Sequence, residues 1–176
     1  MFFFTRRRNP NKKTRTQKRL PLRYVPRQLS DKDKKAQIRE LRRSRSDYKK
    51  GIYHTRKQMK SFKSKPSGHI ANAEKMYKVD KIGATRELAT KTRCTRSALQ
   101  KIISKGQGAY FSSGSRPNQT AQSWGVARLA SSITGGKAAR IDYSILEKGC
   151  QPSSKALRLA KGVPALRKTP KMTTTV

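Results

Sequence analysis

Net positive charge is the property that most constrains this sequence. The 176 residues include 44 Lys and Arg against 9 Asp and Glu, which gives a formal net charge of +35. Such a charge on one compact domain repels itself unless an anionic partner neutralises it. Hydrophobic residues make up only 33% of the chain, so it can bury at most one modest core. The balance argues against a free-standing soluble enzyme and indicates a protein that attaches to an acidic partner.

The charge is distributed unevenly along the chain. Residues 1–65 hold 24 basic and 4 acidic side chains, whereas residues 66–176 hold 20 and 5. Residues 1–29 contain no acid and three prolines, a composition that favours an extended basic arm over a packed core. The arm residues expected to bind a partner electrostatically are Arg6, Arg7, Arg8, Lys12, Lys13, Arg15, Lys18, Arg19 and Arg23.

Residues 30–65 are predicted to form a charged helix followed by a basic ribbon. Ser30 can cap the helix, and Gly51 follows its expected end near Lys50. Asp31 and Asp33 fall in the first turn, where acids favour a helix N-terminus. The apolar stripe is narrow, so we expect this helix to pack weakly and to expose most of its circumference. The expected anchors of the ribbon are Tyr53, Met59 and Phe62.

Residues 66–162 are predicted to form a small globular helical domain, followed by an unstructured or partner-bound tail over residues 163–176. Polar starts, among them Thr95 and Ser153 or Ser154, and glycine stops, among them Gly106, indicate helices near residues 69–78, 96–105, 119–133 and 155–161. Asp142 is expected to cap a short turn through Leu146. Residues 109–112 and 138–141 are candidate strands. The predicted fold class is therefore mainly α with little β, an irregular helical domain preceded by an extended basic arm and a charged helix.

Neither export nor membrane insertion is predicted. The apolar start, Met1 to Phe4, is too short for a signal peptide, and no stretch approaches the roughly 20 apolar residues that cross a bilayer. Cys94 and Cys150 lie far apart and outside any CxxC pair, which predicts reduced thiols in a reducing compartment.

No catalytic, cofactor or metal motif is recognisable in the sequence. The glycines of residues 134–137 lack the spacing of a phosphate-binding loop, and their expected role is to end a helix. His54, His69, Cys94 and Cys150 could in principle hold zinc, but they are scattered singly, whereas zinc modules bring ligands in close pairs. We therefore predict no enzyme activity, no cofactor and no metal.

Residues 109–136 differ from their surroundings because only Arg116 and Arg128 are charged and Ser, Thr, Asn and Gln abound. Arg116 is a candidate anion or carboxylate contact near the start of the following helix, where backbone N–H groups favour negative charge. The simpler interpretation is that the segment builds the core around Trp124, the expected core anchor.

Three blocks of the sequence carry a resemblance: residues 23–38, residues 44–70 and above all residues 105–142, with the run SGSRPNQT through SWG. Over about residues 23–161, the chain resembles an uncharacterised basic domain family of large icosahedral DNA viruses, including algal chloroviruses. The resemblance implies a viral protein that is assembled in the interior of the host cell, and it transfers no catalytic residue.

The resemblance and the charge together lead to an expected function. We expect a minor capsid protein on the inner side of the virion capsid, which links capsomers through its arm. Expected partners are the major capsid protein, other minor capsid proteins and an anionic inner-membrane surface.

The alternative is a nucleic-acid-binding protein, either one that condenses DNA in the virion core or one of ribosomal type. Against specific readout, the sequence lacks nucleic-acid-binding motifs, and aromatic residues interleave with basic ones only at Tyr24, Tyr48, Tyr53 and Phe62. An enzyme built around Arg116 and the Ser-rich loop is a weaker third possibility.

Overall fold

A computed structural model describes residues 20–164, which form a mainly helical fold. The predicted fold class is confirmed: the described residues contain no strand, and only an isolated antiparallel bridge pairs Cys94 with Cys150. The elements are η1 (Leu22–Tyr24), α1 (Asp31–Tyr48), α2 (Gly68–Tyr77), α3 (Arg86–Thr92), α4 (Arg96–Ser112), α5 (Ala121–Ile133), α6 (Lys137–Ile141), α7 (Tyr143–Gly149) and α8 (Lys155–Lys161).

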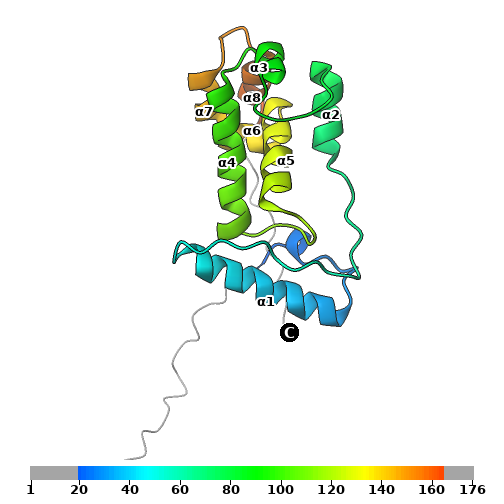
Figure 1. Ribbon diagram of the computed structural model, residues 1–176. Coiled ribbons are helices and arrows are strands. Elements are labelled where there is room, and N and C mark those ends of the chain that lie inside the picture. The colour runs from blue at the N-terminus through cyan, green and yellow to red at the C-terminus, as the bar shows by residue number, and fades with distance from the viewer. Residues whose placement is uncertain (1–19, 165–176) are drawn as a thin grey trace, which may run out of the picture.

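Helices α4 and α5 form the central pair of the bundle and run side by side (Figure 1). A Cβ added at Gly106 would lie 2.6 Å from the Cα of Gly125, so only glycine allows the two backbones to approach this closely. The prediction that Gly106 ends the helix is therefore wrong, and residues 109–112 are the last turn of α4 instead of a strand. Close packing of the two helices compensates for glycine's poor helix propensity.

The expected caps explain most of the other boundaries. The side chains of Ser30, Thr95 and Ser154 each accept a hydrogen bond from a backbone N–H in the first turn of their helices. Residues 138–141 form α6 and are not a strand. Helix α3 was not predicted, because its seven residues bury only Leu88 and Thr92 and give little apolar periodicity.

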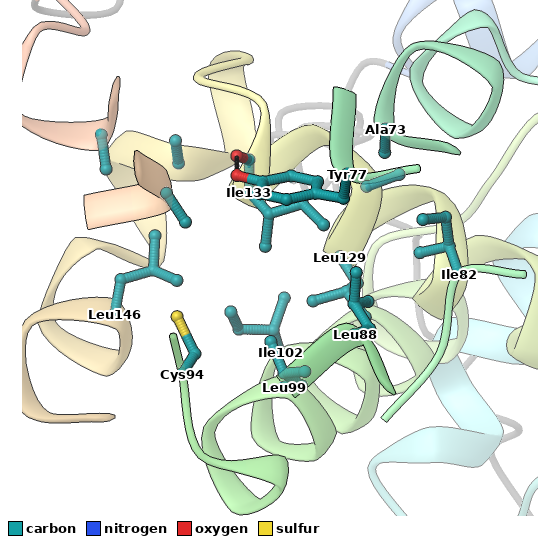
Figure 2. Close-up of a cluster of buried hydrophobic side chains, with 14 of the residues drawn as sticks. Ala73, Tyr77, Ile82, Leu88, Cys94, Leu99, Ile102, Leu129, Ile133 and Leu146 are labelled. Carbon is teal, nitrogen blue, oxygen red and sulfur yellow. Dashed lines mark hydrogen bonds between the residues drawn. The ribbon is translucent and has the colours of Figure 1, made fainter. Parts of the chain in front are cut away.

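The main core lies among α2 to α8. Its centre consists of fully buried side chains from α3, α4, α5 and α7, shown in Figure 2: Leu88, Leu99, Ile102, Leu129, Ile133 and Leu146. The Tyr77 hydroxyl donates a 2.6 Å hydrogen bond to the carbonyl of Ile133, which satisfies its polar end inside the core. Burial raises the pKa of Tyr77 to about 12.

A second, smaller cluster attaches the N-terminal part of the described chain to one end of the bundle. We call η1, α1 and the ribbon of residues 52–65 the base, and α1 crosses the end of α4 and α5 (Figure 1). Tyr24, Val25 and Leu29 are buried against Leu41 and Met59. The described part of the expected arm, residues 20–29, is therefore folded onto α1, while residues 1–19 lie outside the described residues, as do residues 165–176 of the expected tail.

The two cysteines form a disulfide that closes a sequence separation of 56 residues. Two backbone hydrogen bonds flank it, from Thr95 N to Gly149 O (2.8 Å) and from Gln151 N to Arg93 O (2.9 Å). The prediction of reduced thiols is wrong, because the bundle returns the end of α7 to the start of α4. Sequence spacing alone does not reveal such a contact.

We expect reduction of the disulfide to destabilise the domain markedly. A cross-link over this separation lowers the conformational entropy of the unfolded chain, which raises its free energy by about 4 kcal/mol. The variant Cys94→Ala/Cys150→Ala should therefore lose about that amount of unfolding free energy in urea titrations, and reducing agent should affect wild type but not the variant. Equal midpoints for oxidised and reduced wild type would contradict this expectation.

Candidate binding surface

The outward face of α1 is the most strongly charged surface that the structure builds. At 100° per residue, its exposed basic side chains fall within about a third of the helix circumference. These residues form the basic stripe: Lys32, Lys35, Arg39, Arg42, Arg43, Lys49 and Lys50. The opposite side of α1 buries Gln37, Glu40, Leu41 and Ser44 against the rest of the domain.

Three of the four acids of the base, Asp33, Glu40 and Asp47, lie away from the basic stripe, and Asp31 is exposed at its edge. Asp33 accepts hydrogen bonds from the backbone N–H and hydroxyl of Ser61, at 2.8 and 2.6 Å, and these bonds lower the pKa of Asp33. Asp47 pairs with Arg43 at 3.4 Å, and Glu40 is buried. The surface that faces away from the bundle is therefore predominantly positive.

The ribbon keeps its place through the loop between α4 and α5. The Asn118 side chain accepts a 2.7 Å hydrogen bond from Met59 N and donates to Met59 O (3.0 Å) and Phe62 O (2.7 Å). Met59 is buried and Phe62 partly buried, which confirms both as anchors, whereas Tyr53 is 61% exposed. Because Asn tolerates positive φ better than most residues, Asn118 can also adopt its φ of +58° here.

Arg56 is the second link between the ribbon and the bundle, and only 7% of it is exposed. Its guanidinium donates to Ser44 Oγ (3.1 Å), Tyr110 O (2.9 Å) and Ser115 Oγ (2.6 Å), which lie in α1, α4 and the α4–α5 loop. It also stacks 3.7 Å from the ring centroid of the fully buried Tyr110. Burial lowers the pKa of Arg56, and nearby Tyr110 and Glu40 oppose this shift. This arginine therefore has a structural role and does not contribute to the outer charge.

A corner of exposed rings lies where α1 ends. Tyr53 makes edge-to-face contacts with Tyr48 (5.8 Å between centroids) and Phe111 (5.2 Å). We call Tyr48, Tyr53 and Phe111 the aromatic corner. Its outer members are 36% and 61% exposed, and the adjacent Ile52 is 53% exposed. Exposed lysines, Lys49, Lys50 and Lys57, flank it in the sequence.

The structure describes three of the sequence-predicted site residues: Arg23, Arg116 and Trp124. The arm residues Arg6 to Arg19 lie outside the described residues, and Arg23 is exposed in η1 with its guanidinium 5.1 Å from the Tyr24 ring centroid. Arg116 is exposed in the α4–α5 loop, but it does not begin a helix, because Thr120 caps α5.

Trp124 does not lie at the centre of the main core. It is partly buried against the cluster of the base and packs edge-to-face on Tyr24, with 6.1 Å between the ring centroids. The tryptophan therefore helps join α5 to η1. Tyr110, fully buried, is the largest side chain at the interior of this junction.

A buried acid joins α4, α5 and the α6–α7 turn. Asp142 is fully buried and binds Arg128 through two hydrogen bonds (2.8 and 2.7 Å), Ser132 (2.7 Å) and the Lys105 ammonium (3.0 Å). Burial alone would raise the pKa of Asp142, but these bonds outweigh it and lower the pKa. Asp142 stands at the N-cap position of α7, as predicted, but its side chain makes no capping hydrogen bond. Its partners are all structural, so the cluster fastens helices together.

Two further features are absent from the described part of the chain, residues 20–164. No three His, Cys, Asp or Glu side chains gather there as a metal site would require. Within the same residues, no helix is both long and apolar enough to cross a bilayer.

Sequence reasoning did not identify Arg56 or Asn118 as key residues. One Arg among the 16 basic residues of positions 20–65 carries no local mark of burial, and the Asn118 contacts span 56 to 59 residues. The one signal in the sequence for this contact was the polar, nearly neutral run around SGSRPN. Its side chains form hydrogen bonds with the ribbon.

The fold and its surface define a small helical domain with a basic base. The chain belongs to a family described as a family of unknown function (DUF5824), whose model matches residues 21–149. The match begins at η1 and ends with α7, so it covers the base and the bundle except α8. No curated protein and no solved structure matched the chain.

We expect loss of the Asn118 side chain to free the ribbon. The variant Asn118→Gly tolerates the positive φ and removes only the three side-chain bonds, a local loss of about 2 kcal/mol. Amide exchange over residues 56–62 should accelerate while the amides of α4 and α5 stay protected. Asn118→Asp keeps the acceptor for Met59 N, so its exchange rate over residues 56–62 should lie between those of wild type and Asn118→Gly. Unchanged amide exchange over residues 56–62 in Asn118→Gly would show that the Asn118 side chain does not hold the ribbon.

We also expect Asp142 to govern part of the acid sensitivity of the fold. Because its folded pKa is lowered, its stabilisation is complete above the ordinary carboxyl pKa and is lost as pH falls through the folded pKa. Asp142→Asn should cost about 3 kcal/mol in urea unfolding at neutral pH and show a flatter decline toward pH ~3. The exposed Asp80→Asn serves as the control and should retain the wild-type profile.

Proposed function

We propose that this chain is a non-enzymatic structural protein of a large DNA virus particle, attached beneath the major capsid shell through its base. The observation that carries the proposal is the separation of an internally satisfied helical bundle from a base whose outward charge is positive. The viral setting rests on the sequence resemblance.

The basic stripe suits attachment to an extended acidic surface. Helix α1 has 18 residues and is about 27 Å long at 1.5 Å per residue. Its charges are carried on a rigid element that the second cluster holds against the bundle. Binding through this helix therefore costs less conformational entropy than binding through a flexible segment. Acidic undersides of capsomers would offer a complementary surface.

The residues that precede the base add to the same charge. Eight of residues 1–19 are Arg or Lys and none is acidic, and this segment joins the domain at η1, beside α1. Several weak contacts to the major capsid protein, other minor capsid proteins or an anionic inner-membrane surface would reinforce one another through avidity.

The buried polar groups of the described residues also support a structural role. The partners of Arg56 and of Asp142 are side chains and backbone groups of the domain itself, so each cluster joins helices and loops. A buried charge with its bonds satisfied in this way stabilises one arrangement of elements, provided that both partners stay in place.

We expect charge reversal on the basic stripe to weaken attachment to the capsid shell. Lys32→Glu/Lys35→Glu/Arg39→Glu should weaken co-sedimentation with emptied capsid shells by about tenfold or more at physiological salt. The control Lys101→Glu/Lys148→Glu/Lys155→Glu has the same change in net charge, on exposed positions of α4, α7 and α8, and should bind normally.

Two outcomes would contradict the proposal. Equal losses in both triple variants would mean that only overall charge matters. Release of the wild-type protein from particles by nuclease, with none left on the shells, would identify the genome as the partner.

A further inference from the structure

The aromatic corner is an unusual surface for a domain that is otherwise coated with charge. Tyr48, Ile52 and Tyr53 are three of the five large hydrophobic side chains that the structure shows as exposed in residues 20–164, and they lie within six positions of one another. The described residues leave between 36% and 61% of each side chain exposed, and neither capsid attachment by the basic stripe nor core packing requires them.

The ring of Tyr53 is fixed in place without being covered. Edge-to-face contacts with Tyr48 and Phe111 set its orientation, and Phe111 itself packs edge-to-face on the buried Tyr110 at 5.0 Å. Most of the Tyr53 surface nevertheless remains open, at 61%. A ring held in this way loses little conformational freedom when a flat ligand packs against it.

Lysines flank this ring in the sequence. Lys49 and Lys50 precede it at the end of the basic stripe, Lys57 follows it, and all three are exposed. A fixed aromatic face beside lysines is the combination that sequence-tolerant binding of single strands uses: bases stack on the ring and phosphates meet the cations.

We propose that the aromatic corner binds single-stranded nucleic acid, with a base stacked on Tyr53 and the neighbouring phosphates held by Lys49, Lys50 and Lys57. A duplex fits less well, because its bases are already stacked on one another and offer no free face. An anionic membrane also fits less well: the outward face of α1 carries charged residues where an interfacial helix needs a wide apolar face. The inference does not depend on capsid attachment.

The test compares two probes of equal charge on the full chain. One is a labelled oligothymidylate of about 12 nucleotides, and the other is an abasic strand of the same length. Fluorescence anisotropy should show tighter binding of the oligothymidylate. Tyr53→Leu should weaken that binding about five- to a hundredfold, leave the abasic strand unaffected and melt like wild type, because the residue is exposed.

Matched variants separate the contributions of ring, hydroxyl and charge. Tyr53→Phe keeps the π-face and should bind the oligothymidylate like wild type. Lys49→Ala/Lys50→Ala should weaken both probes and lower the salt slope by about 1.4 for a single strand.

Three outcomes would overturn the proposal. The first is equal affinity of the wild type for the abasic strand and the oligothymidylate, because stacking would then contribute nothing. The second is full oligothymidylate binding by Tyr53→Leu. The third is absence of oligothymidylate binding together with binding to phosphatidylserine vesicles that Tyr53→Leu retains, which would assign the corner to lipid.

Discussion

The contact between the α4–α5 loop and the ribbon is the interaction on which the rest of the base depends. Asn118 binds the backbone of Met59 and Phe62, and Ser115 accepts a hydrogen bond from the buried Arg56. Gly114, at a φ of +104°, completes the contact, because a Cβ there would lie 2.7 Å from Leu41 in α1. Together with the packing of Trp124 on Tyr24, this loop sets the orientation of the basic stripe relative to the bundle.

The charge of +35 therefore has two separate components. A few of the basic residues are used inside the fold: Arg56 donates to groups of three elements, and Arg128 pairs with the buried Asp142. Most of the other basic residues in the described part of the chain are exposed, and on α1 they are concentrated on one side, away from Asp33, Glu40 and Asp47. Composition predicts an acidic partner, whereas the fold determines which side of α1 presents the charge.

Local signals were sufficient to predict the helices that have clear ends. Ser30 and Ser154 marked the starts of α1 and α8, and the mainly helical class followed from such signals. The errors share a physical cause, since each concerns a long-range contact. Gly106 was interpreted as a stop because its partner Gly125 was unknown, and Cys94 was interpreted as a thiol because α7 had not been placed beside it. For the same reason, the burial of Arg56 and the position of Trp124 at the junction could not be predicted from periodicity.

The disulfide has a mechanical consequence. Its covalent ring includes residues 94–150, and hence α4 to α7 and the Asn118 loop, but the whole base lies outside it. Tension applied at the N-terminal end of the described chain would therefore reach the hydrogen bonds and apolar contacts of the base before it reached the cross-linked bundle. Under force, the base should therefore detach first, while the helices inside the covalent ring stay folded. When the force is removed, the base can pack again on the intact helices.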